Sequence, residues 1–234
     1  MQNVKKNRRM RYKLTLISFI TLLIISCDLK TAPEYLMEAE KLEQQGKFKE
    51  AIQLLDKAIL KDENFLGAYI NRGADKSELA EYVSAIEDYK KVIEIDPKNT
   101  LALYNIGNNY KRCKNYKKSL EFYNKAFDTK GGDTSYIDLA ENSFVDLGQE
   151  FDVPGKEIYY ERGISFFYLD SLNNSFKDFR NCIKQNYKSA ESNYWLGHIY
   201  LRTNQKKLAC EKFNEAKELG DKDAEGEIKK YCNQ

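Results

Sequence analysis

The stretch FKEAIQLLDKAI, Phe48–Ile59, has two counterparts further along the same chain. YVSAIEDYKKVI, Tyr82–Ile93, and YKKSLEFYNKAF, Tyr116–Phe127, follow it at equal intervals and align with it without a gap. In each stretch an aromatic residue opens the segment, and apolar residues three and four places apart form one face of a helix. A fixed period of about 34 residues indicates a repeat protein, in which each unit packs only against its neighbours.

The segments upstream of these stretches keep the same register. Each carries a small residue in the eighth place of its unit, at Ala39, Gly73 and Gly107. The period and these small residues resemble the tetratricopeptide repeat (TPR), in which each unit is a pair of antiparallel helices. The resemblance implies an all-α fold, a right-handed superhelical solenoid of helix-turn-helix units in which the small residues let the paired helices approach closely.

Five units and one insertion account for most of the chain. The register is lost after DTKGGD and returns at Gly163 and Gly197, which again take the eighth place and lie one period apart. Pro154 and Gly155 oppose helix, so the insertion should be a loop with at most one short helix. The expected boundaries are repeats 1–3 at 32–133, an insertion loop at 134–155, repeats 4 and 5 at 156–223, and a C-terminal capping helix in 224–234.

A basic block and a short apolar run begin the chain. Six Lys and Arg residues precede residue 14 with no acidic residue among them, and an apolar run extends from Leu14 to Ile25. A helix of ~12 residues is roughly 18 Å long, shorter than the ~30 Å hydrocarbon core of a bilayer. This pattern is typical of a secretory signal, so we expect residues 1–26 to be a cleaved signal peptide.

The end of this signal, Ile24–Cys27, reads IISC and resembles the lipobox of bacterial lipoprotein precursors. The resemblance implies cleavage before Cys27, a diacylglycerol on its thiol and an acyl chain such as palmitate on the new amino terminus. Two or three acyl chains make a stable anchor. Residues 27–31 would link this anchor to the first repeat in the bacterial cell envelope, at the outer membrane or cell surface if the bacterium is Gram-negative. The alternative is an uncleaved single-span helix in which Cys27 has no role.

The charge of the chain changes if the signal is removed. The whole sequence has 38 Lys and Arg against 36 Asp and Glu, but six of these basic residues precede Cys27. The chain from Cys27 onward therefore has a net charge of about −4 rather than +2. This balance gives no support for nucleic-acid binding.

The sequence offers no constellation for catalysis, a metal or a cofactor. His198 is the single histidine, and no second His or Cys stands at ligand spacing on its helical face. There is no Gly-rich phosphate loop of the Walker or dinucleotide type. We therefore predict a non-enzymatic protein without a cofactor or metal, in which His198 is a polar groove residue.

Four cysteines follow Cys27. Cys182 takes a small-residue place in its helix and is expected to be a buried free thiol. Cys113 stands in a polar context, KRCKN, with no evident role. The final helix should pack on the second helix of the fifth unit, so Cys210 and Cys232 are candidates for a disulfide, which an exported compartment permits. Whether their Cα atoms fall within the required ~7 Å is left open by the sequence.

The resemblance also implies a binding surface. In TPR solenoids the first helices of the units line a concave groove, and fixed places on each helix face it. Aromatic rings interspersed with Arg are typical of protein-binding hot spots. Each tyrosine alone could instead be a packing residue between repeats. The candidate groove residues are Tyr104, Asn105, Asn108, Arg112, Tyr160, Phe167, Tyr194, His198 and Arg202.

Aromatic rings are unevenly distributed along this expected groove. The third to fifth units are rich in them, whereas the first two offer mainly Leu36, Ile70 and small or acidic residues. We therefore expect a partner to dock on the C-terminal units. The predicted function is a membrane-anchored scaffold or peptide-binding adaptor for a protein or peptide partner. The alternative is a non-catalytic docking subunit of an envelope enzyme complex.

Overall fold

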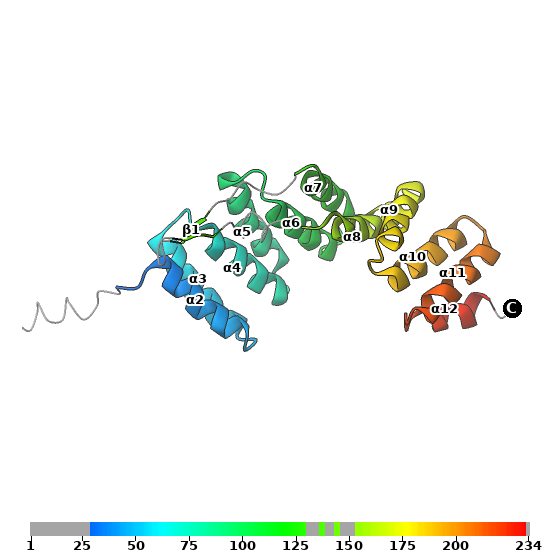
Figure 1. Ribbon diagram of the computed structural model, residues 1–234, viewed down its shortest axis with the longest axis horizontal. Helices are drawn as coiled ribbons and strands as arrows, with labels where there is room; N and C mark the ends of the chain where they lie inside the picture. Colours follow the sequence, from blue (N-terminus) through cyan, green and yellow to red (C-terminus); the bar gives the residue numbers. More distant parts are fainter. Residues whose placement is uncertain (1–28, 130–135, 139–142, 146–152, 233–234) are drawn as a thin grey trace, which may run out of the picture.

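The computed structural model describes residues 29–129, 136–138, 143–145 and 153–232. Within them, antiparallel helix pairs follow one another along a line from α2 to α12, as predicted from the repeat (Figure 1). Units 1 to 3 are α2 (Ala32–Glu43) with α3 (Phe48–Lys61), α4 (Leu66–Glu78) with α5 (Tyr82–Ile95), and α6 (Thr100–Arg112) with α7 (Tyr116–Asp128). Units 4 and 5 are α8 (Gly155–Tyr168) with α9 (Leu172–Lys184), and α10 (Ser189–Arg202) with α11 (Lys206–Glu218). The last helix is α12 (Ala224–Tyr231).

Local sequence signals explain several helix starts. Thr31 and Glu34 form a capping box at the start of α2, where each side chain accepts a hydrogen bond from the other residue's backbone N–H. The Asn99 side chain accepts a bond from the Ala102 N–H at 2.9 Å and so caps α6. These caps satisfy backbone donors that have no partner inside the helix.

The turn inside each unit depends on one residue with a left-handed backbone. In the fifteenth place of the five units, φ is 72° at Gly46, 60° at Ala80, 57° at Lys114, 59° at Asp170 and 58° at Asn204. Only the first unit uses glycine, the residue that adopts this conformation without a steric cost. In the other four units a residue with a Cβ atom adopts this conformation, which strains the backbone.

Each unit is held together by a large side chain of the second helix that packs on the small eighth residue of the first. A Cβ atom added to Gly107 would lie 2.6 Å from two ring carbons of Tyr123, so no side chain fits there. Tyr123, Phe179 and Phe213 are completely buried at this contact, as is Leu55 in the first unit. The close helix approach expected from the small residues is therefore present.

The solenoid continues across the insertion. Helix α8 packs against α7 and also contacts α6. Ser119 of α7 and Ser165 of α8 are 3.0 Å apart through their hydroxyl oxygens, and Arg162 of α8 donates to Asn124 of α7 at 3.1 Å. Units 3 and 4 are thus neighbours in space although the insertion separates their helices, which end at Asp128 and begin at Gly155.

The described residues between α7 and α8 form no helix, and α8 begins at Gly155, the last residue of the expected insertion. The insertion holds two short antiparallel strands, β1 (Tyr136–Asp138) and β2 (Ser143–Val145), which pair in the register Tyr136 with Val145 and Asp138 with Ser143. The sequence predicted only a loop there, so the strand pair is an addition to that expectation. Strands this short give too weak a period-two pattern to be recognised in advance.

Candidate functional site

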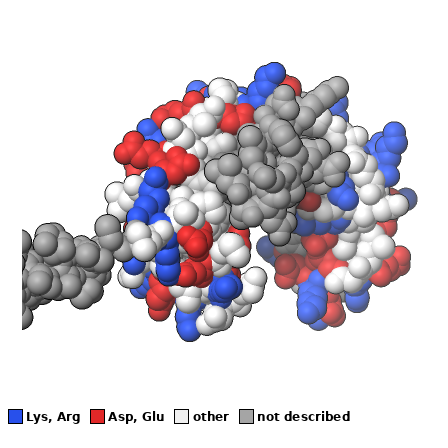
Figure 2. Space-filling model, turned by 60° about the vertical axis from the view of Figure 1, so that its left-hand side comes forward, with Lys and Arg blue, Asp and Glu red and all other residues white. Residues whose placement is uncertain are grey.

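The first helices of successive units form one continuous face. Helix α2 contacts α4, α6 contacts α8, and α8 contacts α10. We call the surface carried by α2, α4, α6, α8 and α10 the first-helix face; it bears all nine candidate groove residues. Acidic and basic side chains are mixed over the side of the molecule displayed in Figure 2. That side therefore gives no indication that a partner is recognised through a surface of uniform charge.

The amide residues of α6 are already tied to one another. The Tyr123 hydroxyl donates to Asn108 Oδ1 at 2.7 Å, and Asn108 Nδ2 lies 3.5 Å from Asn105 Oδ1. The Tyr104 ring packs against the Tyr123 ring with centroids 5.9 Å apart, and burial raises the pKa of Tyr104. The exposed Arg112 guanidinium lies 5.8 Å from the centre of the Tyr82 ring. The structure therefore brings Tyr104, Asn105 and Asn108 together.

An ion-pair group links units 3, 4 and 5 on this face. Lys111 of α6 pairs with Glu161 of α8, and Lys188, just before α10, lies 3.8 Å from the other Glu161 oxygen. The Glu161 side chain is only 15% exposed. A carboxylate so covered favours two cationic partners, and the group fixes the relative positions of three units.

Two predicted groove residues are buried instead of open. Tyr160 is 9% exposed and Phe167 is 7% exposed. The Tyr160 ring makes edge contacts with Phe179 and Tyr187 at 6.0 and 6.5 Å, and its burial raises the pKa of Tyr160 to about 12. The expectation that both rings are presented to a partner is therefore wrong, because rings of unit 4 itself cover Tyr160, and Trp195 of unit 5 covers Phe167. They belong to the core between α8, α9 and α10.

Five rings that remain partly accessible form a chain of contacts that begins at Tyr116, the first residue of α7, and continues along the first helices α8 and α10. Successive centroid distances are 4.5 Å from Tyr116 to Tyr168, 6.1 Å from Tyr168 to Trp195, 6.1 Å from Trp195 to His198, and 4.6 Å from His198 to Tyr194. We call these five residues the aromatic strip. Tyr168 is 49% exposed and lies between Tyr116 and Trp195. The strip runs without interruption from unit 3 to unit 5.

Arg202 carries a positive charge beside the strip, and His198 is a titratable ring within it. The Arg202 guanidinium lies 4.1 Å from the centre of the Phe167 ring, and Nη1 donates to the Phe167 carbonyl at 2.9 Å. Burial lowers the pKa of His198, and the nearby carboxylate of Glu227 on α12 partly opposes this shift. The lowered pKa of His198 favours the neutral form of its ring. Among the described residues, no group of three His, Cys, Asp or Glu side chains is placed to hold a metal.

The cysteines fall into two classes. Cys210 of α11 and Cys232, directly after α12, form a disulfide with Cα atoms 5.7 Å apart, which joins the terminal helix to unit 5. Cys182 is buried and free, and burial raises the pKa of its thiol to about 12. Cys113 is free and exposed. Cys27 and the expected signal peptide lie outside the described residues.

Three strip residues, Tyr116, Tyr168 and Trp195, are absent from the nine candidate groove residues, and Trp195 is the most central of them. It stacks on Phe179 with parallel rings 6.0 Å apart and contacts Phe167, Tyr168 and Tyr194. It stands in the sixth place of its unit, the same place as the candidate groove residue Asn105 in unit 3. That repeat register was a sufficient signal to find it.

Comparison with known families agrees with this architecture. A family model described as TPR repeat matches residues 78–112, and one described as tetratricopeptide repeat matches 101–131 and 190–223. Residues 78–131 and 190–223 therefore match tetratricopeptide repeats. A TPR repeat-containing protein of Methanocaldococcus jannaschii is 26% identical over 178 residues, which are 75% of this chain. This chain spans only 29% of the length of that relative.

Solved structures share the fold at low sequence identity. MamA of Desulfovibrio magneticus RS-1, from residue 41 to its end, superposes with a TM-score of 0.66 at 18% identity, covering 80% of this chain and 94% of that one. YrrB, described as a TPR protein with an unusual peptide-binding site, gives 0.65 at 19% identity, with 84% and 90% covered. PilF of Pseudomonas aeruginosa gives 0.61 at 15%, with 81% and 76% covered. These likenesses establish the TPR solenoid fold. Within the described ranges, no helix is both long enough and apolar enough to cross a membrane.

Proposed function

We propose that this TPR protein is a non-enzymatic interaction scaffold whose first-helix face binds a protein or peptide partner on the aromatic strip. The observation that carries the proposal is the unbroken chain of ring contacts from Tyr116 to Tyr194, which includes the half-exposed Tyr168. Aromatic side chains beside an arginine supply a disproportionate share of interface energy. The peptide-binding site described for YrrB supports a peptide as the class of partner.

A site-specific photo-crosslinker tests this proposal. We replace Tyr168 with a photoreactive phenylalanine analogue in the full chain, and we place the same analogue at Val83, which is 69% exposed on the second helix α5. Irradiation of cells should give a discrete adduct from position 168 that is weakened when Arg202→Ala is added. Equal adducts from both positions, or an adduct indifferent to Arg202, would contradict a specific site on the strip.

We further propose that the scaffold is lipid-anchored through Cys27 in a bacterial envelope. This rests on the basic block, the short apolar run and the IISC end of the signal. The segment 27–31 spans at most roughly 17 Å, so the first repeat would lie close to the lipid surface. Metabolic labelling with a clickable fatty acid should mark the wild-type chain and not Cys27→Ala. Equal labelling of the two would favour the uncleaved single-span alternative.

A docking subunit of an envelope enzyme complex is the second candidate. The large, continuous first-helix face suits either role. Stoichiometric co-purification of a catalytic chain with the position-168 adduct would favour the docking subunit, whereas adducts with a non-catalytic partner would favour the adaptor.

A further inference from the structure

A cavity of about 450 Å³ lies between α9, α10 and α11, at the junction of units 4 and 5. This size falls within the usual range of ligand pockets. Phe176 and Ile183 of α9 and Leu196 and Tyr200 of α10 line it with apolar surface. None of the five residues of the aromatic strip lines it, so it is separate from the site proposed above.

The cavity coincides with a departure from the repeat pattern. Asn193 lines it and stands in the fourth place of unit 5. The fourth place is Tyr35 in unit 1, Tyr69 in unit 2, Leu103 in unit 3 and Tyr159 in unit 4. At the junctions of units 1 and 2 and of units 2 and 3, Tyr69 and Leu103 in this place are at most 8% exposed. In unit 5 the same place carries a shorter side chain, and a cavity lies beside it.

Asn193 also leaves a polar atom without a partner. The residue is only 3% exposed, yet its Oδ1 accepts no hydrogen bond from any described residue. Buried polar atoms in native proteins are nearly always paired, so an exception requires an explanation. Protein atoms cover this oxygen, so the explanation here is imperfect packing at the floor of the cavity, where the short Asn193 side chain lies.

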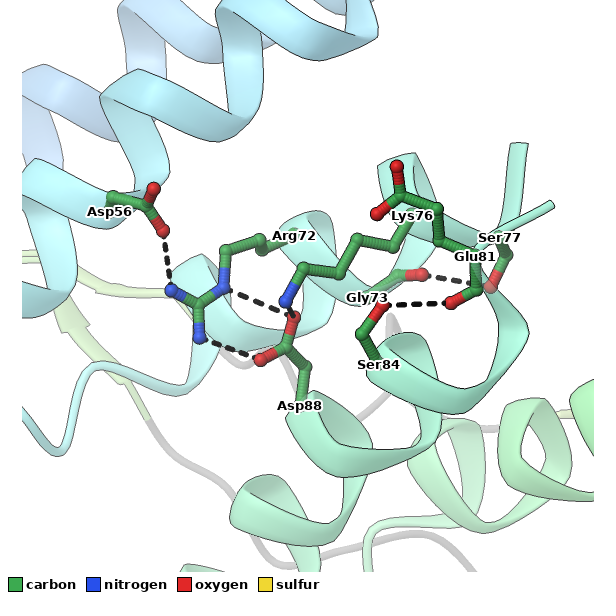
Figure 3. Close-up of polar contacts among 8 residues, drawn as sticks. All are labelled: Asp56, Arg72, Gly73, Lys76, Ser77, Glu81, Ser84 and Asp88. Atoms are coloured by element: carbon green, nitrogen blue, oxygen red, sulfur yellow. Dashed lines mark hydrogen bonds and ion pairs between the residues drawn. The ribbon is translucent and has the colours of Figure 1, made fainter. Parts of the chain in front are cut away.

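The charges around the cavity differ in sign from those at the corresponding places between units 1 and 2. There, Arg72 bonds both Asp88 oxygens at 2.6 and 3.1 Å and pairs with Asp56 at 2.5 Å, while Lys76 also pairs with Asp88 at 2.7 Å (Figure 3). Two carboxylates and two cations thus balance within the chain. Figure 3 shows the four side chains converging from α3, α4 and α5.

In unit 5 the register puts different residues in these four places. Leu196 replaces Arg72 and Tyr200 replaces Lys76, whereas Lys212 replaces Asp88 and Arg180 replaces Asp56. Both acidic places of the unit 2 junction are therefore basic here, and both basic places are uncharged. Lys184 adds a further cation to the lining.

One carboxylate faces these cations. Glu215 pairs with Lys212 at 2.6 Å. Arg180 lies 5.9 Å from the Phe176 ring centre, and within the described part of the chain neither it nor Lys184 forms an ion pair. The cavity therefore has unbalanced positive charge at its rim.

We propose that this cavity binds an acidic peptide segment, with a Glu or Asp side chain at Arg180 and Lys184 and an adjacent apolar side chain against Phe176, Ile183 and Tyr200. Charge complementarity selects the anion. A bare carboxylate leaves the apolar wall uncovered, so an anion alone satisfies fewer of the groups present. A peptide segment supplies both features together.

The test is an NMR titration of the full, isotope-labelled chain in detergent micelles with acetyl-Glu-Leu-amide. The matched probe acetyl-Gln-Leu-amide lacks only the charge, and succinate and inorganic phosphate are the anions without a peptide. We expect saturable shifts in α9, α10 and α11 with the Glu probe and at least ~10-fold weaker binding of the others. Glu and Gln probes of equal affinity would overturn the proposal, and so would succinate or phosphate binding as tightly as the Glu probe.

Two variants and a matched control assign the binding to the cavity. Arg180→Gln with Lys184→Gln should weaken the Glu probe ~10-fold, whereas Lys90→Gln, at the place in unit 2 that matches Arg180, should leave it unchanged. Asn193→Tyr restores the ring found in other units and should abolish the titration without lowering the melting temperature. Undiminished binding by either cavity variant overturns the proposal. If Asn193→Tyr fails to fold, the Arg180 and Lys184 variant decides.

The two proposed sites can fail separately. Tyr168→Ser changes the aromatic strip and should not alter the titration with the Glu probe. The cavity variants should not alter the adduct formed from position 168. If one cavity variant lost both the titration with the Glu probe and the adduct from position 168, at an unchanged melting temperature, the two would be a single site. That result would overturn the proposal of an independent site in the cavity.

Discussion

The contact between the first helices of units 1 and 2 is polar, whereas the same contact between units 4 and 5 is apolar. At the first contact the twelfth place of one unit and the tenth place of the next are Glu43 and Asp75; at the second they are Phe167 and Ile199. Asp75, Phe167 and Ile199 are all buried. The repeat thus fixes where the helices lie and leaves the chemistry of each contact free.

This freedom has a different consequence in each half of the solenoid. The apolar contact of units 4 and 5 supports the aromatic strip, because Phe167 packs beneath Trp195 and His198 at 5.1 and 6.3 Å. The polar contact of units 1 and 2 leaves Asp75 Oδ2 buried and without a hydrogen-bond partner among the described residues. The same contact between first helices is therefore lined by aromatic rings in one half of the solenoid and by carboxyl groups in the other.

The largest expected effect comes from removing the ring on which the C-terminal contact rests. Phe179 is completely buried, contacts Tyr160 and stacks on Trp195. Phe179→Ala should lower the free energy of unfolding by about 3–5 kcal/mol, through lost transfer energy and the cavity left behind. Thermal and denaturant unfolding measure it. The control Val83→Ala, at a largely exposed position, should change it by less than about 0.5 kcal/mol; similar losses in both would refute the packing role.

The polar contact predicts a dependence of stability on pH. Burial, followed by the charges of Glu43 and Glu78, raises the pKa of Asp75 from 3.8 to about 7. Between these values the folded chain binds more protons than the unfolded chain, so this group stabilises the fold at low pH and loses that contribution as pH rises toward 7. Asp75→Asn should therefore raise the free energy of unfolding at pH 8, by on the order of 2 kcal/mol, and change it little at pH 4.

Denaturant melts of the wild type and Asp75→Asn at the two pH values measure this difference. Asp62→Asn, at an exposed carboxyl group, is the control for the loss of one negative charge from the chain. A difference between wild type and Asp75→Asn that is equal at pH 4 and pH 8 would mean that Asp75 titrates alike in the folded and unfolded chains.

The contact between the two helices of a unit recurs in both halves of the solenoid. Where it joins a glycine to an aromatic ring, the addition of a single methyl group should destabilise the fold. In Gly107→Ala the new Cβ would meet the Tyr123 ring, which is buried and cannot move away. Overpacking should cost about 1–3 kcal/mol and outweigh the better helix propensity of alanine. In Gly226→Ala the added Cβ has nothing within 4 Å, so there the propensity should win and stabilise α12 slightly. Opposite signs in thermal melts are expected; equal signs would contradict the role of the contact.

The sequence predicted the fold because the repeat depends on positions inside each unit. Gly107 and Tyr123 face each other within one unit, so their spacing alone reveals the pair. The ring of Phe167 is covered instead by Trp195 of the next unit, and no spacing within the unit carries that information. Tyr160 contacts Tyr187 in the segment after α9, whose position the helical spacing does not fix. The contact of Cys210 with Cys232 likewise depends on where α12 docks.

The cavity beside Asn193 was visible in principle from the sequence. Its signal is one residue that breaks a column of Tyr and Leu, together with Lys212 and Arg180 in places where the unit 2 junction has aspartates. Such breaks are also common where a repeat has merely drifted. The buried, unpaired amide oxygen distinguishes this one, and only the structure reveals it.

The smallest expected effect concerns the turn that all five units share. Ala80 has φ 60° and is exposed, so its strain comes from its own Cβ rather than from packing. Relief of a left-handed alanine is worth roughly 1–2 kcal/mol, but glycine makes the unfolded chain more flexible and costs about 0.4–1 kcal/mol. Ala80→Gly should therefore stabilise the chain by a net of about 0.5 kcal/mol in denaturant melts. Asn204→Gly should gain less, because asparagine tolerates this conformation, and Gly46→Ala should lose about 1 kcal/mol. If Ala80→Gly and Asn204→Gly destabilised the chain and Gly46→Ala stabilised it, the entropy of the unfolded chain would dominate, and the shared turn would carry no strain for glycine to relieve.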